Sequence, residues 1–187
     1  MDTRDALLTA AEDVCRKRGY DGFSYADLAR EVGIRKASIH HHFPTKADLA
    51  VALIDSYSDA FFAALERIEQ RHETSAGRLR AYLSRYRRAL EGGESVCLCV
   101  SMSLGRDRLS DAGLAGLKRF HERSHAWLLR AFEQAQSDQG VRDLGAPVDE
   151  ARACLAMVEG AQLIARALGR SAAFDHAVKT FSARLAA

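Results

Sequence analysis

Two prolines in 187 residues, and no long uninterrupted apolar run, set the first limits on this chain. A membrane span needs about 18 or more consecutive apolar residues, so we expect no membrane partner. The segment Met1-Asp2-Thr3-Arg4-Asp5 lacks the layout of a secretion signal, which favours a cytoplasmic location. With 48% hydrophobic and 28% charged residues, the composition is that of an ordinary globular protein and excludes a fibrous or disordered chain.

Cysteine and net charge are also sparse. The four cysteines are Cys15, Cys97, Cys99 and Cys154. Without a secretion signal they favour reduced thiols over a disulfide framework. The formal net charge of +2 is too small to indicate a partner by itself. What matters is therefore where the basic residues lie along the chain.

Helical periodicity organises the first 43 residues into three short helices. Apolar residues recur at spacings of three and four from Leu7 to Cys15, which predicts a first helix ending near Gly19. Ser24 is a good N-cap for a second helix that stops at Gly33. A third helix is expected from about 35 to 43, because Pro44 cannot continue it.

The rest of the chain also reads as helices, and strand signals are nearly absent. Thr45-Lys46-Ala47-Asp48 resembles a capping box that opens a long fourth helix to about Arg71. Glycine-rich breaks then predict helices near 76–90, 96–104, 110–137, 148–168 and 174–185. We therefore expect an all-α fold of about nine helices. We place a head of three short helices at residues 1–46 and a larger helical body at residues 47–187.

The third predicted helix separates its side chains into two faces. At about 100° per residue, Ile39 and Phe43 fall on one side and are expected to pack. The other side carries Lys36, Ala37, His40 and His41. Residues 30–46 carry four basic residues and one acidic residue, a local charge of +3 with histidine neutral. A helix braced on one side and carrying these groups on the other suits a DNA major groove.

These residues resemble the head of a tetracycline-repressor (TetR/AcrR) family regulator. The resemblance is continuous over residues 5–50, through Arg18 to Ser24, Asp27 to Ile34, and Lys36 to Leu49. It implies a transcriptional repressor that acts as a homodimer on double-stranded operator DNA and responds to a small-molecule effector. No enzyme activity, cofactor or metal is implied.

The resemblance also assigns contacts within the head. It implies that Ser24, Tyr25 and Lys46 lie near phosphates, and that Lys36, Ala37 and His40 approach bases. Many relatives have glycine in place of Ala37 and tyrosine in place of His40, so His40 is a reassigned contact. The full candidate DNA-binding set is Ser24, Tyr25, Arg35, Lys36, Ala37, Ser38, His40, His41, Thr45 and Lys46. Ser24 and Thr45 begin helices, where hydroxyls and free backbone N–H groups bind phosphate.

The body offers a candidate ligand pocket and a candidate dimer surface. Apolar and aromatic side chains from several predicted helices are expected to line the pocket; they are Phe61, Tyr82, Tyr86, Cys97, Met102, Phe120, Trp127 and Met157. The segment 151–168 is rich in small residues, which permit close approach between helices. Together with the last helix it is expected to form a two-fold interface.

Several alternatives remain open at this stage. The segment Val96 to Val100 is similar to a subset of the family that includes electrophile-sensing repressors, so Cys97 or Cys99 is either a redox sensor or a buried core residue. A sensor should be partly exposed. A cysteine-dependent enzyme would need a base and an oxyanion donor that no motif supplies. A helical scaffold leaves the head unexplained. His40, His41 and His42 point about 100° apart and cannot converge on one metal ion.

Overall fold

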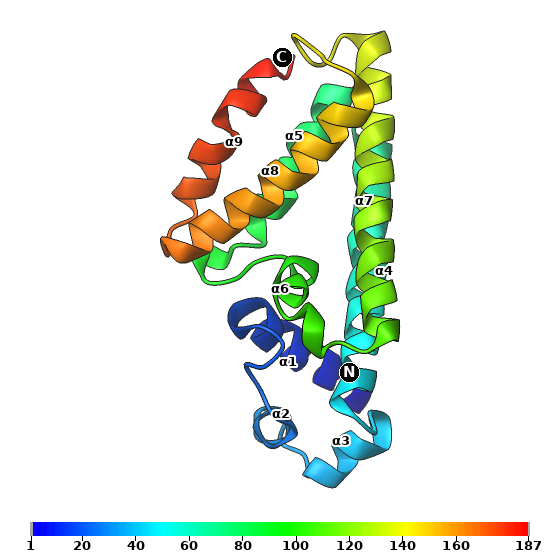
Figure 1. Ribbon diagram of the computed structural model, residues 1–187, viewed down its shortest axis with the longest axis vertical. Helices are drawn as coiled ribbons and strands as arrows, with labels where there is room; N and C mark the ends of the chain where they lie inside the picture. The colour runs from blue at the N-terminus through cyan, green and yellow to red at the C-terminus, as the bar shows by residue number, and fades with distance from the viewer. Residues whose placement is uncertain (1, 187) are drawn as a thin grey trace. The chain divides into compact units, whose positions relative to one another are not determined.

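The computed structural model describes residues 2–186, which form nine α-helices (Figure 1). In chain order these are α1 (Thr3–Arg18), α2 (Tyr25–Val32), α3 (Lys36–His42), α4 (Lys46–Arg71), α5 (Ser75–Arg88), α6 (Leu98–Leu104), α7 (Asp111–Asp138), α8 (Pro147–Ala167) and α9 (Ala172–Arg184). Short 3₁₀ turns cover Glu91–Gly93 and Arg106–Arg108. The predicted all-α fold with a helix-turn-helix at its N-terminus is confirmed. Among these helices none combines the length and apolar character needed to cross a lipid bilayer.

The helices form two compact units. The first contains the chain up to Ala60 together with Leu98–Phe120, and the second contains Phe61–Cys97 and the chain from His121 onward. Both α4 and α7 contribute residues to each unit. The predicted boundary between residues 46 and 47 separates a DNA-binding head from the rest of the chain by function and not by packing. It stays a prediction.

The first unit is built on buried side chains of α1, α2 and α3. Leu7, Leu28 and Ile39 are fully buried, and each comes from a different one of these helices. The helix α6 packs on α1. The Ser101 hydroxyl of α6 donates a 2.6 Å hydrogen bond to the carbonyl oxygen of Cys15 near the end of α1. The same carbonyl also accepts from the Gly19 N–H at 2.9 Å, so the Ser101 bond uses its second lone pair and ties α6 to the end of α1.

Local capping sets the helix boundaries of this unit. The Ser24 side chain accepts from the Asp27 backbone N–H while the Asp27 carboxylate accepts from the Ser24 backbone N–H, which is a capping box at the start of α2. Gly33 ends α2 in the left-handed region, at φ 75°, where a Cβ would be strained. The predicted ends at Ser24 and Gly33 are confirmed.

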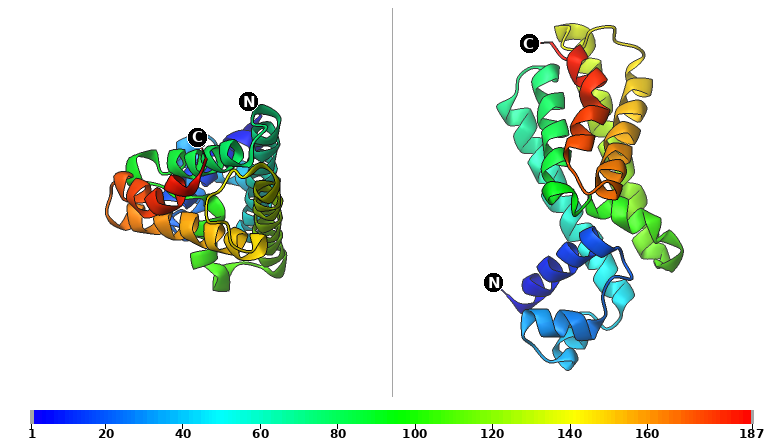
Figure 2. Two further views of the ribbon diagram at one scale, coloured as in Figure 1. Left: turned by 90° about the horizontal axis from the view of Figure 1, so that it is seen from above. Right: turned by 90° about the vertical axis from the view of Figure 1, so that its left-hand side faces the viewer.

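In the second unit, α9 packs between two other helices. In the right-hand view of Figure 2, α9 lies between α5 and α8, and it contacts both. Tyr82, Phe132 and Phe174 are at most 1% exposed and form part of the core. Their burial removes large apolar areas from water, which is the main stabilising contribution of such a core.

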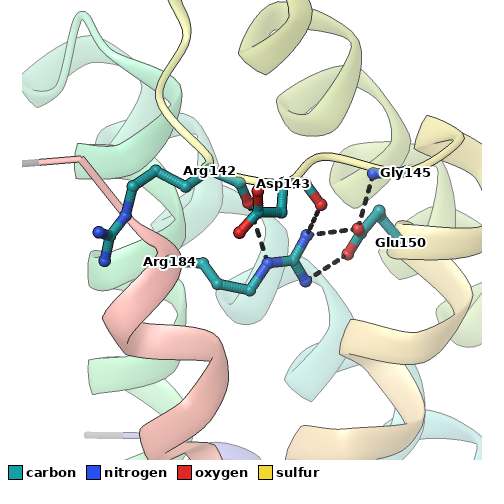
Figure 3. A network of polar contacts seen from close by, with 5 residues as sticks. All are labelled: Arg142, Asp143, Gly145, Glu150 and Arg184. Carbon is teal, nitrogen blue, oxygen red and sulfur yellow. Dashed lines mark hydrogen bonds and ion pairs between the residues drawn. The ribbon is translucent and has the colours of Figure 1, made fainter.

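An ion pair joins the end of α9 to the first turn of α8, beside the loop that precedes α8 (Figure 3). Two Arg184 nitrogens donate to the two Glu150 carboxylate oxygens, at 2.6 and 3.1 Å. The same guanidinium donates to the backbone carbonyls of Arg142 and Asp143, and Glu150 also accepts from the Gly145 N–H. Hydrogen bonding from Arg184 lowers the pKa of Glu150. The network holds the loop closed against both helices.

Candidate nucleic-acid interface

One side of α3 is anchored and the other is open. Ile39 is fully buried and Phe43, just after the helix, is 3% exposed. The exposed side chains at and beyond the start of the helix are Arg35, Lys36, Ala37, His40 and His41, and Ser38 is half-buried. The sequence of α3 contains no acidic residue. This is the two-faced arrangement that the periodicity predicted.

The two basic side chains at the start of α3 are available to a partner. Neither Arg35 nor Lys36 has a side-chain hydrogen bond or ion pair with any residue in the range 2–186. Arg30, in the last turn of α2, differs because it pairs with Asp27 at 2.7 Å. Two uncompensated basic side chains of the head therefore lie at the N-terminal end of α3, where recognition helices contact base edges.

His40 is held in a defined orientation. Its Nδ1 lies 3.1 Å from the carbonyl oxygen of Pro44. Its ring meets that of Tyr25 edge to face, with centroids 5.0 Å apart. Because a carbonyl only accepts, Nδ1 carries the proton of this bond. The exposed ring therefore keeps Nε2 for an external partner.

Tyr25 is a bracing residue in this fold. Its side chain is buried, and the hydroxyl lies within hydrogen-bonding distance of the carbonyl oxygens of Phe43 (3.0 Å) and Thr45 (2.5 Å). Burial raises the pKa of Tyr25 to about 12, so the hydroxyl keeps its proton at neutral pH. The hydroxyl expected near a phosphate is thus directed at the junction between α3 and α4.

Lys46 is similarly engaged inside the first unit. Its Nζ donates a 2.7 Å hydrogen bond to the Phe23 carbonyl and lies over the rings of Tyr20 and Phe23, at 4.7 and 4.3 Å from their centroids. Burial lowers the pKa of this lysine. The ammonium group connects the first turn of α4 to the loop between α1 and α2.

Ser24 and Thr45 are exposed, and carboxylates already occupy their capping groups. The hydroxyl and backbone N–H of Ser24 both donate to Asp27, and those of Thr45 both donate to Asp48. Hydrogen bonding from Ser24 lowers the pKa of Asp27. The backbone N–H groups expected to be free at these two residues are therefore occupied. The three-residue spacing between Ser24 and Asp27 is the sequence pattern that indicates such a capping box.

The candidate pocket residues fall in both compact units. Met102 and Phe120 belong to the first unit, while Phe61, Tyr82, Tyr86, Cys97, Trp127 and Met157 belong to the second. Met157 is half-buried and the other seven are buried. The structure brings four of them into contact. Tyr82 stacks on Trp127 at 5.3 Å, Tyr86 lies 5.0 Å from Tyr82, and Phe61 lies 6.0 Å from Tyr86.

All four cysteines are buried free thiols. Burial raises the pKa of both Cys15 and Cys154 to about 12. Cys97 precedes α6 instead of lying within the predicted helix of 96–104, and its backbone N–H donates to the Gln162 side chain at 2.8 Å. With 1% of Cys97 and none of Cys99 exposed, neither has the exposure expected of a sensor.

Comparison with known proteins gives a consistent result. Residues 7–53 match the family described as bacterial regulatory proteins, tetR family. The chain is 28% identical over 171 residues to the HTH-type transcriptional repressor NemR of Escherichia coli strain K12, covering 88% of this chain and 84% of that protein. A crystal structure of a TetR family transcriptional regulator from Agrobacterium tumefaciens superposes with a TM-score of 0.92 at 29% identity, covering 98% and 97% of the two chains. The reduced form of Escherichia coli NemR has the same fold, with a TM-score of 0.83 at 24% identity over 99% and 98%.

Proposed function

The chain belongs to the TetR family of DNA-binding transcriptional regulators, and on that premise we propose that it is a repressor which a small ligand releases from a palindromic operator. The observation that carries the proposal is the open face of α3, where Arg35, Lys36 and His40 stand exposed over the buried anchor Ile39. Because a repressor binds operator DNA, the proposal includes a cytoplasmic location.

The contacts divide into two kinds. Lys36, Ala37 and His40 meet base edges and thymine methyl groups, and Arg35, Ser38 and His41 flank them. Ser24 and Thr45 contact phosphates through exposed hydroxyls, which first have to turn away from their carboxylate partners. Tyr25 and Lys46 act from behind, because their polar groups hold the ends of α2, α3 and α4 together.

A homodimer supplies the second recognition helix. The small residues of α8 divide between two faces: Ala161 and Ala165 pack inside the chain, whereas Ala153 and Ala156 are exposed. On the exposed side are also three large apolar residues, Leu163, Ile164 and Leu168, at 37%, 52% and 54% exposure. An apolar helix face of this kind supports a self-complementary interface. The two-fold pair then reads half-sites about 34–36 Å apart.

The effector binds among the aromatic side chains of the second unit. Trp127 Nε1 and the buried Ser124 hydroxyl have no hydrogen-bond partner among residues 2–186, and a polar ligand would satisfy them. The rings of Tyr82 and Trp127 are in contact, so the ligand has to part them. Helix α4, which contributes to both units, carries the change to the head, with a coupling of about 1–3 kcal/mol.

A gel-shift assay on DNA from beside the protein's own gene tests the proposal. We expect the wild type to shift one fragment with an inverted repeat, and a Lys36→Ala variant to bind it about 5- to 150-fold more weakly. The exposed Arg106 lies outside the head, so Arg106→Ala is the matched control and should bind like the wild type. If the wild type shifts no such fragment, the repressor proposal is wrong, and a helical scaffold or a cysteine-dependent enzyme becomes the better explanation.

The role of α4 has its own test. A proline placed at Asp55 breaks the helix between its two parts. If the effector still releases this variant from DNA as it releases the wild type, α4 does not carry the signal.

A further inference from the structure

A groove of about 680 Å³ lies between the second half of α4 and helix α5, entirely within the second unit. Small and apolar residues form part of its lining, including Ala64, Ile68 and Ala81. Five arginines also line it, namely Arg67, Arg71, Arg80, Arg85 and Arg88. No aspartate or glutamate is among the lining residues.

None of the five arginines is neutralised by a carboxylate within residues 2–186. Arg67 and Arg71 lie one turn apart on α4 and have no side-chain partner in this part of the chain. The nearby Glu69 is already paired with Arg130. Like charges at this spacing destabilise a helix. Because no carboxylate offsets them, the groove carries a concentrated positive charge, although the net charge of the whole protein is only +2.

The α5 arginines are partly preorganised. The Arg85 guanidinium lies 4.6 Å from the centroid of the Phe61 ring, and its buried Nε has no hydrogen-bond partner among the described residues. Arg88 donates to the Ser84 hydroxyl at 3.1 Å and Arg80 to the Leu185 carbonyl at 3.3 Å. These contacts orient the guanidinium groups and leave further N–H donors unused, since each guanidinium has five.

We propose that this groove binds a small organic polyanion, a molecule carrying two or more carboxylate or phosphate groups on a short organic frame. Arginine matches both kinds of group through paired N–H···O bonds. The apolar lining suits the frame between the charged groups. The volume is in the range of small-molecule sites, about 300–1,000 Å³, and the arginines line one half-open groove from two helices. A DNA backbone would instead require a basic surface that extends along the duplex.

None of the residues that line this groove belongs to the aromatic cluster around Trp127, although Arg85 lies over the ring of Phe61 at the edge of that cluster. The inference does not depend on the proposed repressor function. Binding is measured here without DNA. A protein that fails to bind an operator but binds a polyanion would contradict the repressor proposal alone, and the reverse result would contradict this one alone.

Isothermal titration calorimetry on the full chain tests the inference, with citrate, pyrophosphate and acetate as probes at low and at physiological ionic strength. We expect citrate or pyrophosphate to bind with one site per chain at both ionic strengths, and acetate to give no saturable heat. Which polyanion binds more tightly distinguishes a carboxylate ligand from a phosphate ligand. No saturable binding of either, or binding lost at physiological ionic strength, overturns the proposal.

Matched variants locate the site. Arg67→Gln/Arg71→Gln should weaken binding by about tenfold or more, because each lost charge-assisted hydrogen bond is worth that much. Arg67→Lys/Arg71→Lys keeps the charge but loses the paired geometry, and it should fall in between while preserving the fold. Arg106→Gln/Arg170→Gln removes the same charge elsewhere and should bind like the wild type. Equal binding by all variants, or binding of an acidic peptide by a protein that ignores both polyanions, would contradict the proposal.

Discussion

The imidazole Nδ1 of His40 lies 3.1 Å from the carbonyl oxygen of Pro44, two residues beyond the end of α3. The bond fixes which ring nitrogen carries the proton and which is presented outward. His40 is therefore an oriented group on an otherwise open helix face, although its side chain is exposed.

Two substitutions of His40 test the roles of its Nδ1 and Nε2 atoms separately. His40→Asn retains a donor that reaches Pro44 but removes the outer nitrogen, so we expect operator affinity to fall by about 1–3 kcal/mol with little loss of stability. His40→Gln, which places a polar group near the position of Nε2, should lose less. Fluorescence anisotropy with labelled operator measures both. The exposed His176 on α9 supplies the control His176→Asn, and an equal loss in that variant would contradict the role of His40.

Removing the Tyr25 hydroxyl should destabilise the protein. Tyr25→Phe leaves the carbonyls of Phe43 and Thr45 without this donor, so we expect the free energy of unfolding to fall by about 1–2 kcal/mol in urea titrations. The hydroxyl of the neighbouring buried Tyr20 makes no hydrogen bond with residues 2–186, so Tyr20→Phe should change stability by less than about 0.5 kcal/mol. Similar losses in both variants would show that the Tyr25 hydroxyl has no special role.

A charge on the exposed face of α8 should prevent dimerisation. Ile164→Glu places a carboxylate in an apolar contact, where an unpaired charge is strongly disfavoured. Sedimentation velocity should show a dimer for the wild type and a monomer for the variant. Leu104 is 74% exposed and lies on α6, so Leu104→Glu is the matched control and should remain dimeric. A dimeric Ile164→Glu protein would exclude this face as the interface.

The Glu150–Arg184 pair should make stability depend on pH. Arg184 lowers the pKa of Glu150 in the folded state below the ordinary 4.5, so folding favours the ionised form. Its contribution is complete above the unfolded pKa and is lost as the pH falls through the folded value. We expect Glu150→Gln to cost about 2–3 kcal/mol at pH 7, because it leaves Arg184 partly buried and unpaired. Below about pH 4 the difference from the wild type should shrink. Glu66→Gln, at an exposed residue, should show neither effect, and a difference that stays constant with pH would refute the assignment.

Oxidation should not distinguish the Cys97→Ser variant from the wild type. The thiol is 1% exposed, and reactive cysteines are accessible thiolates. Operator binding measured after treatment with a mild oxidant should therefore respond alike in both proteins. Release of the wild type combined with retention by the variant would instead establish Cys97 as a redox sensor.

The sequence by itself determined the helices and the two faces of the recognition helix. Capping, left-handed glycine and apolar periodicity act between residues no more than about four positions apart, so they can be read along the chain. The predicted helices 110–137 and 148–168 accordingly differ by one residue at each end from Asp111–Asp138 and Pro147–Ala167.

Only the tertiary structure decided which polar groups are already engaged. Tyr25 meets Thr45 across 20 residues, Lys46 meets Phe23 across 23, and Ser101 meets Cys15 across 86. The division of the small residues of α8 between core and surface, and the gathering of arginines between α4 and α5, arise in the same way. No local pattern encodes them, because the environment of a side chain depends on partners that the fold brings from distant parts of the chain.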